Sequence, residues 1–216
     1  FFHSVTLDRD KCRGCINCIK RCPTEAIRVR NKKAQIIAER CIDCGECIRV
    51  CPHHAKRATS DKLSILSKFE YTIALPAPSF VAQFNNLEDV DIVLNALIDF
   101  GFDEVYEVAR AAEIVSAATR KLMKEGALPR PVISSACPAV TRLIRVRFPS
   151  LIDHILPLNA PLEVAARLAK RAAAEKTGLP PEKIGAIFLS PCPAKVTAIR
   201  MPLGTEKSAV DGAIAV

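Results

Sequence analysis

The chain has 216 residues, half of them hydrophobic and a quarter charged, and its formal net charge is +8. This length suits a small domain joined to a larger one, and the apolar fraction is large enough to form a buried core. There is no apolar stretch long enough to span a bilayer and no visible signal peptide, so we expect a cytoplasmic protein without membrane partners.

Eight of the ten cysteines fall into two copies of one pattern, C-x2-C-x2-C-x3-C-P. This spacing is typical of bacterial ferredoxins that hold two [4Fe–4S] clusters, in which the fourth cysteine of each copy ligates the other cluster. The pattern therefore predicts one cluster on Cys12, Cys15, Cys18 and Cys51. It predicts a second cluster on Cys41, Cys44, Cys47 and Cys22.

Two other uses of cysteine fit this pattern less well. A zinc ribbon needs two C-x2-C pairs about 15–20 residues apart, without a third and fourth cysteine in each group. Disulfides belong to secreted chains, and thiolate clusters need the reducing setting that we expect here.

The positive charge concentrates around the cysteine motifs. The basic residues of this region are Arg9, Lys11, Arg13, Lys20, Arg21, Arg28, Arg30, Lys32, Lys33, Arg40, Arg49, Lys56 and Arg57. Two dianionic clusters offset about four of these charges, so we expect no nucleic-acid partner despite the basic composition. The remaining positive face is either a docking surface for an acidic electron carrier or an ordinary solvated face.

Residues 1–62 are predicted to form a small α+β, ferredoxin-like domain. The segment Ala26–Arg30 pairs with Ala34–Ile37 as a hairpin, and Phe2–Leu7 pairs with Lys56–Thr59. Short helical turns are expected after each Cys-Pro pair. Because its own apolar core is thin, this domain should need its clusters to fold.

Residues 63–216 alternate between strand and helix patterns, which predicts a parallel α/β sheet. The predicted strands are Tyr71–Leu75, Pro131–Ser135, Ile184–Leu189 and Val210–Val216. The predicted helices are Leu87–Phe100, Ala109–Lys124, Ala139–Phe148 and Leu162–Thr177.

The two remaining cysteines, Cys137 and Cys192, occupy matching places. Each follows a predicted strand and precedes a proline that can begin a helix. Since α/β sheets bind ligands at the carboxyl ends of their strands, the two cysteines could converge on one site. On spacing alone, two ordinary buried thiols are the favoured interpretation, since free cysteine is often part of a core.

The later motifs resemble those of the [FeFe]-hydrogenase large subunit. The family motif Thr-Ser-Cys-Cys-Pro-x-Trp is similar to Ser134-Ser-Ala-Cys-Pro-Ala-Val140. Its motif Met-Pro-Cys-x-x-Lys-x-x-Glu is similar to Ser190-Pro-Cys-Pro-Ala-Lys-Val-Thr-Ala198, and Leu75-Pro76-Ala77 resembles a turn that lines the family's diiron pocket.

The resemblance implies an H-cluster, which combines a third [4Fe–4S] cluster with a diiron site. Cys137 and Cys192 would be two of the four ligands of that cluster, and Pro76 and Ala136 would line the diiron pocket. Lys195 would donate a hydrogen bond to a cyanide of the diiron site. Without the motif, Lys195 is better read as a solvated residue early in a helix.

Departures from the family motifs point to slow turnover. Ala136 stands at the family's proton-relay cysteine, and Ala198, Ser190 and Val140 replace its Glu, Met and Trp. This pattern is similar to that of sensory hydrogenases.

No cysteine follows Cys192, whereas the family has a third motif with two more, so we expect this chain to be an inactive piece of a longer protein.

We therefore expect an iron–sulfur electron-transfer protein of the [FeFe]-hydrogenase type. It would pass electrons between an H-cluster and a redox carrier or signalling domain, with hydrogen sensing as the task of the full-length protein. The alternative is a ferredoxin-like electron-transfer or interaction module that has no diiron site.

Overall fold

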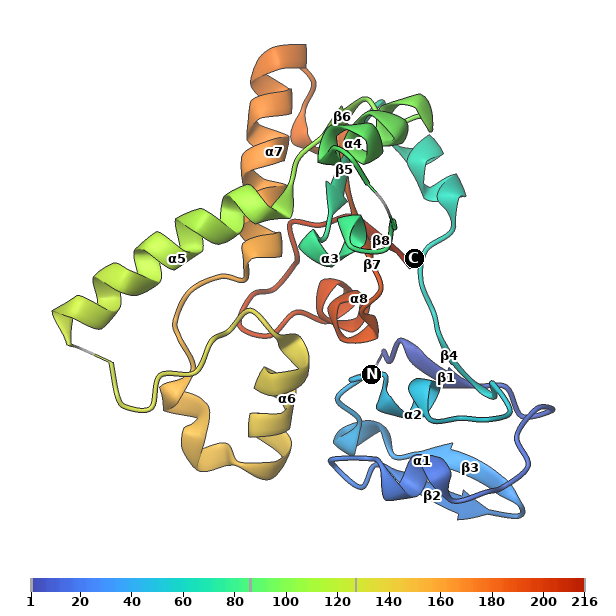
Figure 1. Cartoon of the computed structure of the whole chain (residues 1–216). Coiled ribbons are helices and arrows are strands. Elements are labelled where there is room, and N and C mark those ends of the chain that lie inside the picture. The colour runs from blue at the N-terminus through green and yellow to red at the C-terminus, as the bar shows by residue number, and fades with distance from the viewer. Residues whose placement is uncertain (1, 86, 127, 216) are drawn as a thin grey trace.

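A computed structural model describes residues 2–85, 87–126 and 128–215. The cysteine-rich N-terminal domain lies against one end of a larger α/β lobe (Figure 1). Within the described ranges, no helix combines the length and apolar character needed to cross a membrane.

The N-terminal domain contains two small antiparallel sheets. Strand β1 (Val5–Leu7) pairs with β4 (Lys56–Ala58), and β2 (Ile27–Arg30) pairs with β3 (Lys33–Ile36). Both predicted pairings are therefore confirmed. The connection between β2 and β3 is a two-residue turn, Asn31 and Lys32, and both residues have positive φ, as the tight hairpin turns require.

The expected helical turns after the Cys-Pro pairs are wrong. The two short helices, α1 (Asn17–Lys20) and α2 (Glu46–Arg49), lie inside the cysteine motifs instead. After each Cys-Pro pair the chain makes a single turn, closed by the amides of Glu25 and His54 on the Cys22 and Cys51 carbonyls. Glu25 and His54 have left-handed backbones, which cannot continue a helix, and a strand follows soon afterwards.

The larger lobe is built on a four-stranded sheet in the order β6-β5-β7-β8. The strands are β5 (Tyr71–Pro76), β6 (Glu104–Val105), β7 (Ile184–Ser190) and β8 (Gly212–Ala215). All neighbouring pairs are parallel, so the predicted parallel α/β sheet is confirmed. Val216, the last residue of the strand expected at the end of the chain, lies outside the described residues.

Helices surround this sheet. They are α3 (Pro78–Val81), α4 (Val90–Asp99), α5 (Val108–Glu125), α6 (Pro138–Arg147), α7 (Pro161–Thr177) and α8 (Pro193–Arg200). Four 3-10 helices are η1 (Ala38–Arg40), η2 (Leu63–Lys68), η3 (Pro149–His154) and η4 (Pro181–Lys183). Proline opens α6, α7 and α8, where its missing N–H costs nothing.

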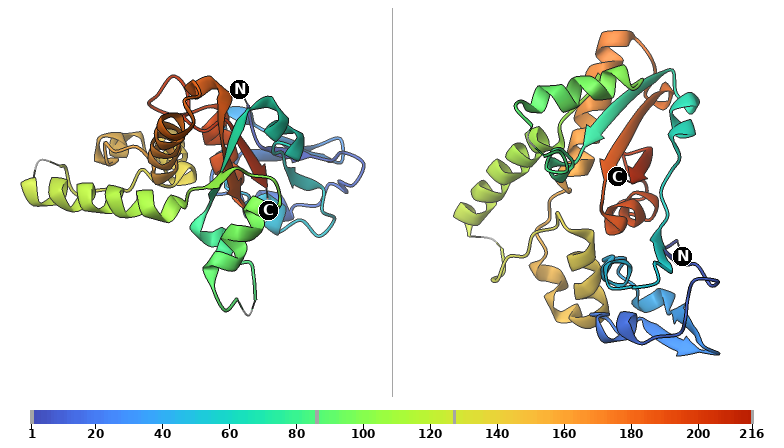
Figure 2. Two further views of the ribbon diagram at one scale, coloured as in Figure 1. Left: turned by 90° about the horizontal axis from the view of Figure 1, so that it is seen from above. Right: turned by 45° about the vertical axis from the view of Figure 1, so that its right-hand side comes forward.

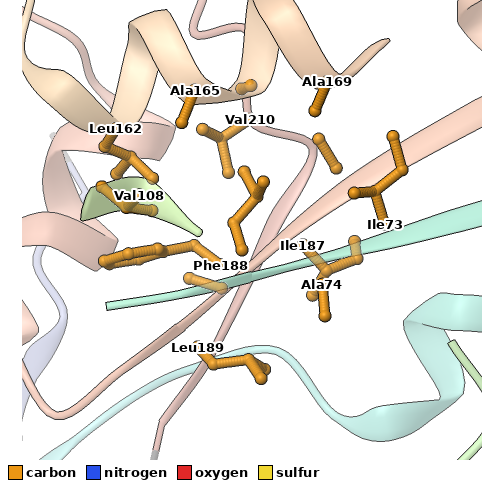
Figure 3. Close-up of a cluster of buried hydrophobic side chains, with 14 of the residues drawn as sticks. Ile73, Ala74, Val108, Leu162, Ala165, Ala169, Ile187, Phe188, Leu189 and Val210 are labelled. Atoms are coloured by element: carbon orange, nitrogen blue, oxygen red, sulfur yellow. The ribbon is translucent and has the colours of Figure 1, made fainter. Parts of the chain in front are cut away.

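The core lies between β5, β7 and helix α7. Strand β7 is buried along its whole length, as a central parallel strand should be. Ala165 and Ala169 project from α7 toward the strands, and both are 0% exposed (Figure 3). Their small side chains let α7 approach the sheet closely, which fixes the position of β7 and of the Cys192 segment that follows it.

Helix α5 extends away from the body of the lobe (Figures 1 and 2). Of its side chains, Val108 and Ala111 in the first turns are buried. Beyond this helix, the strand expected over 131–135 is wrong, because only Ile133 forms an isolated parallel bridge, with Ile155. Pro129 and Pro131 lack N–H donors, and the apolar pair Val132–Ile133 is too short to extend the pairing.

Candidate iron–sulfur centres

The first candidate centre is a small pocket at the meeting point of the two cysteine motifs. Cys41, Cys44 and Cys47 of the second copy line it together with Cys22 of the first copy. The apolar side chains of Val5, Ile27 and Ile36 and the backbone of Gly45 complete its walls. The four thiols are those that the crossed pattern assigns to one cluster.

The thiols of this pocket favour their protonated form unless a cation stabilises the thiolates. Burial raises the pKa of the Cys41 thiol to about 12, and the neighbouring Asp43 carboxylate adds to the rise. Burial also raises the pKa of Cys47 to about 11. Cys22 makes a smaller contribution in the same direction to both, which reflects its place beside them. Because iron is bound by thiolates, this set of buried thiols suits a cationic metal centre.

Backbone amides donate to the sulfurs at equivalent places in the two copies. Ala26 N–H donates to Cys22 Sγ at 3.2 Å, and Ala55 N–H donates to Cys51 Sγ at 3.3 Å. Both alanines are the fourth residue after their cysteine, and both are buried. Amide donors of this kind stabilise thiolate ligands and help to set cluster potentials.

The second candidate centre is formed around Cys12, Cys15 and Cys18. Cys12 and Cys18 are buried in one apolar cluster, against which Cys22, Cys47 and Cys51 also pack. Burial pushes the pKa of Cys12 upward, but amide donors from Ala34 and Gly14, with the charges of two lysines, reverse this and lower it. The structure thus brings Cys51 to the first copy's cysteines, and cluster ligation by each set remains a prediction.

Three polar residues near the thiols were missed by sequence reasoning. Asp43 is buried and accepts hydrogen bonds from Val5 N–H at 3.0 Å and pairs with His3 Nδ1 at 2.7 Å. Ligand atoms of His3, Asp43 and Cys41 lie within 4.8 Å of one another. Lys56 is 3% exposed, and its Nζ has no hydrogen-bond partner among the residues described. An orphaned cation beside these cysteines fits an anionic iron–sulfur cluster.

The Cys44–Gly45 loop touches the larger lobe at the start of α8. A Cβ atom on Gly45 would lie 3.0 Å from Cγ of Pro193, the residue after Cys192. Close by, Ser4 Oγ donates to the Pro193 carbonyl at 2.6 Å, and Thr197 Oγ1 accepts from Ser4 N–H at 3.1 Å. Thr197 and Ser4 are fully buried, so this contact is a packed interface.

Helix α6 reaches the same centre. Burial lowers the pKa of Arg142, and the charges of Asp43 and Cys41 oppose this effect, which places the guanidinium near both. Arg142 Nη2 donates to the Met201 carbonyl at 2.8 Å, just past the end of α8. Helices α6 and α8 contact each other, and both face the N-terminal domain (Figures 1 and 2).

Cys137 and Cys192 are the N-cap residues of α6 and α8. Cys192 lies two residues after the end of strand β7, and its N–H donates to Ser190 Oγ at 3.1 Å. Cys137 does not follow a strand of the sheet, because the strand expected before it is absent, but α6 and α8 contact each other. The expected convergence of the two cysteines on one site stays a prediction. Cys137 is exposed and Cys192 is half-buried.

A pocket of about 430 Å³ opens beside these helices. Ala136, Lys195 and Ala198 line it, together with Ser135 and Glu163. Pro76, which was expected to line the diiron pocket, is not among the lining residues of this pocket. It is the last residue of β5 and pairs with Leu189 of β7. Lys195 Nζ lies 5.3 Å from the centre of the Phe188 ring, which holds the ammonium near the pocket. Cys137 and Cys192 are not among the lining residues of this pocket, and their role as ligands of a third cluster stays a prediction.

An N-terminal iron–sulfur domain on a parallel α/β lobe, with cysteine-capped helices at their junction, defines a hydrogenase-like class of protein. Residues 70–216 match the family described as iron only hydrogenase large subunit, C-terminal domain. Residues 4–52 match a 4Fe-4S dicluster domain. The chain belongs to the iron-only hydrogenase large-subunit family, and carries an N-terminal 4Fe–4S domain.

Individual relatives agree with this assignment. The periplasmic [Fe] hydrogenase large subunit of Nitratidesulfovibrio vulgaris is 30% identical over 213 residues, covering 89% of this chain and 50% of its own length. Iron hydrogenase 1 of Clostridium pasteurianum is 29% identical over 220 residues, covering 89% and 38%. The cytosolic Fe-S cluster assembly factor nar1 of Aspergillus flavus is 27% identical over 114 residues, covering 53% and 18%. This chain therefore spans half or less of the length of these relatives.

Solved structures support the fold. A variant of [FeFe]-hydrogenase HydA1 from Chlamydomonas reinhardtii superposes with a TM-score of 0.55 and 22% identity. The superposition covers 71% of this chain and 43% of that chain. At this identity the likeness supports the α/β fold of the lobe and carries no information on its chemistry.

Proposed function

We propose that this chain transfers electrons through two [4Fe–4S] clusters in its N-terminal domain to and from an H-cluster site in its α/β lobe. Cys12, Cys15, Cys18 and Cys51 hold one cluster, and Cys41, Cys44, Cys47 and Cys22 hold the other. Cys137 and Cys192 contribute two thiolates to the H-cluster, which supplies the hydrogen chemistry when it is bound. The partner that exchanges electrons with the N-terminal clusters is a redox carrier or a signalling domain.

The contact between Gly45 and Pro193 carries this proposal. Gly45 follows a predicted ligand of one cluster, and Pro193 follows a predicted ligand of the H-cluster. Electron transfer slows steeply with distance, so adjacent ligand loops favour direct transfer between the two centres. The buried hydrogen bonds between Ser4 and Thr197 hold the loops in this arrangement.

We further propose that the full-length protein senses hydrogen and is not a fast catalyst. Ala136 and Ala198 line the pocket beside Lys195, at positions where the family motifs have a thiol and a carboxylate. A methyl group cannot donate or accept a proton. Missing general acid–base groups typically cost about 10²–10⁴ in rate.

Infrared spectroscopy of the matured full-length protein tests the proposal. Bands from bound CO and cyanide should appear, because these ligands belong to the diiron site. The spectrum of a variant with both Cys137→Ser and Cys192→Ser should lose them. A wild-type protein that carries the ferredoxin-type clusters but shows no such bands would exclude the H-cluster.

The alternative is an iron–sulfur transfer or assembly module without a diiron site. The similarity to cytosolic Fe-S cluster assembly factors over about half of the chain favours it, as does the exposure of Cys137. In that case the infrared bands are absent, and iron at Cys137 and Cys192 should be lost to a chelator faster than iron in the N-terminal domain.

A further inference from the structure

In the internal repeat, Lys56 of the second copy stands at the position of a buried apolar residue of the first copy. The offset of 29 residues that relates Cys12 to Cys41 also relates Ile27 to Lys56. Ile27 is 3% exposed and belongs to the apolar cluster of the N-terminal domain. Lys56 is also 3% exposed, so the chain buries a cation where the first copy buries a hydrocarbon.

The neighbours of Lys56 in the fold place it close to the cysteines. Lys56 pairs with Leu7 in the β1–β4 ladder, and the preceding Ala55 donates its N–H to Cys51 Sγ. Leu7 packs against the apolar cluster that contains Cys12 and Cys18, and β4 contacts α2, which carries Cys47. The buried Lys56 side chain thus lies near both groups of cysteines. It forms no ion pair within the described part of the chain, and its Nζ is without a hydrogen-bond partner there.

The ammonium lies near thiols of both predicted clusters. Burial raises the pKa of Cys18 and of Cys47, and the charge of Lys56 is the largest influence that opposes it in each case. Lys56 also contributes to the lowered pKa of Cys12, after the larger effects of burial, amide donors and Lys33. Cys12 and Cys18 belong to one predicted cluster, and Cys47 belongs to the other.

A buried ammonium with no partner is strongly unfavourable, and natural proteins pair such groups with anions. Each oxidised cluster with four thiolates is formally dianionic and becomes more negative when it is reduced. Two anions on either side of one cation satisfy Lys56 without a carboxylate.

We propose that Lys56 is a buried cation shared by the two cluster sites, which raises the reduction potentials of both clusters. Each reduction adds one electron from an external donor to a cluster, with no bond made or broken. The added negative charge is stabilised by the nearby ammonium, so the potential rises. This inference rests on the two-cluster part of the proposed function and is independent of the H-cluster.

Redox titration followed by electron paramagnetic resonance tests the proposal on the anaerobically reconstituted chain. Lys56→Met removes the charge at similar length, and Lys56→Ile introduces the residue that the first copy accepts at this place. Arg57→Met is the matched control, because Arg57 is the next residue on β4 but is exposed and paired with Asp8.

The expected shift follows from Coulomb's law. An effective protein dielectric of about 20 and a separation of about 10 Å give about a tenfold change in the reduction equilibrium. For a one-electron couple, tenfold corresponds to about 59 mV. Both clusters should shift downward by about this amount in Lys56→Met and Lys56→Ile, and by much less in Arg57→Met.

Potentials that move no more in the Lys56 variants than in Arg57→Met would overturn the proposal. A shift of one cluster alone would overturn the shared placement. Loss of a cluster from both Lys56 variants would also count against it, because Lys56 would then be needed for retention. Failure of the wild-type chain to reach eight irons would instead reject the two-cluster assignment, following from two four-iron clusters.

Discussion

Replacing Gly45 with alanine tests the interface between the two predicted centres. Gly45 has φ of 80°, and an added Cβ would lie 3.0 Å from Pro193 Cγ. A left-handed alanine costs about 1–2 kcal/mol, and overpacking against a fixed ring costs about 1–3 kcal/mol. We therefore expect Gly45→Ala to destabilise the cluster-loaded chain by about 2–5 kcal/mol.

Gly126→Ala is the matched control for backbone strain. Gly126 has φ of 69°, and nothing lies within 4 Å of the position of an added Cβ. It should cost about 1–2 kcal/mol from the left-handed backbone alone. The stabilities of both variants are compared by hydrogen exchange, with the protection of α8 as the local readout.

A double-mutant cycle isolates the contact. Pro193→Ala removes the ring that the new methyl group meets, so it should recover the part of the Gly45→Ala cost that exceeds the Gly126→Ala cost. The same reasoning predicts that Gly45→Ala slows electron transfer between the lobes, and that the double variant restores part of the rate. If Gly45→Ala costs no more than Gly126→Ala, or if Pro193→Ala relieves nothing, the close packing at this interface is refuted.

Three further predictions concern the centres. Cys22→Ser should damage the cluster held by Cys41, Cys44 and Cys47, as seen by iron analysis and spectroscopy, and damage confined to the Cys12 cluster would contradict the crossed arrangement. Residues 1–60 should exchange amide hydrogens much faster without iron, because metal binding contributes directly to folding; equal protection with and without iron would contradict this. The matured full-length protein should turn over hydrogen slowly, and Ala136→Cys should recover part of the roughly 10²–10⁴ lost; fast turnover with Ala136 intact would exclude the sensor role.

Most of the fold follows from local patterns in the sequence. The hairpin of β2 and β3 and the parallel strands β5 and β7 lie where alternation and apolar runs predict them. Helix ends at Gly126 and Gly178 were also predictable, because both glycines adopt the left-handed conformation that ends a helix. These features depend on a few neighbouring residues and need no knowledge of tertiary contacts.

The errors arise where tertiary structure overrides a local pattern. The segment 131–135 has strand-like residues, but its prolines limit pairing to the single bridge between Ile133 and Ile155. Short helices were expected after Pro23 and Pro52, yet the helical turns wind between the cysteines. There they turn the loop so that several sulfurs can face one pocket, a requirement of the metal site that propensity does not contain.

The cysteines of the candidate centres were visible in the sequence, whereas the groups that surround them were not. His3 and Asp43 meet only after folding, from segments far apart in the chain. Lys56 could have been noticed by aligning the two copies, because it replaces Ile27 within an otherwise similar Cys-Pro-x-x-Ala context. Its meaning depends on burial, and burial of a charge cannot be read from a basic stretch that is mostly exposed.

Gly45 at the domain interface and Lys56 near the cluster sites bear on the same proposed path of electrons. Gly45 lets the loop of one predicted cluster approach Pro193, and Lys56 is the buried cation that we propose serves both cluster sites. If Lys56 raises the potentials of both clusters, electrons from the α/β lobe reach acceptors that are easier to reduce than unassisted clusters. On the proposed sensing role, Ala136 and Ala198 would also limit proton delivery, so electrons would arrive slowly, which suits detection more than bulk turnover. The order of the two cluster potentials in wild type and Lys56→Met, measured against the hydrogen couple, distinguishes these uses: potentials that stay below the hydrogen couple in both proteins would argue against electron flow out of the lobe.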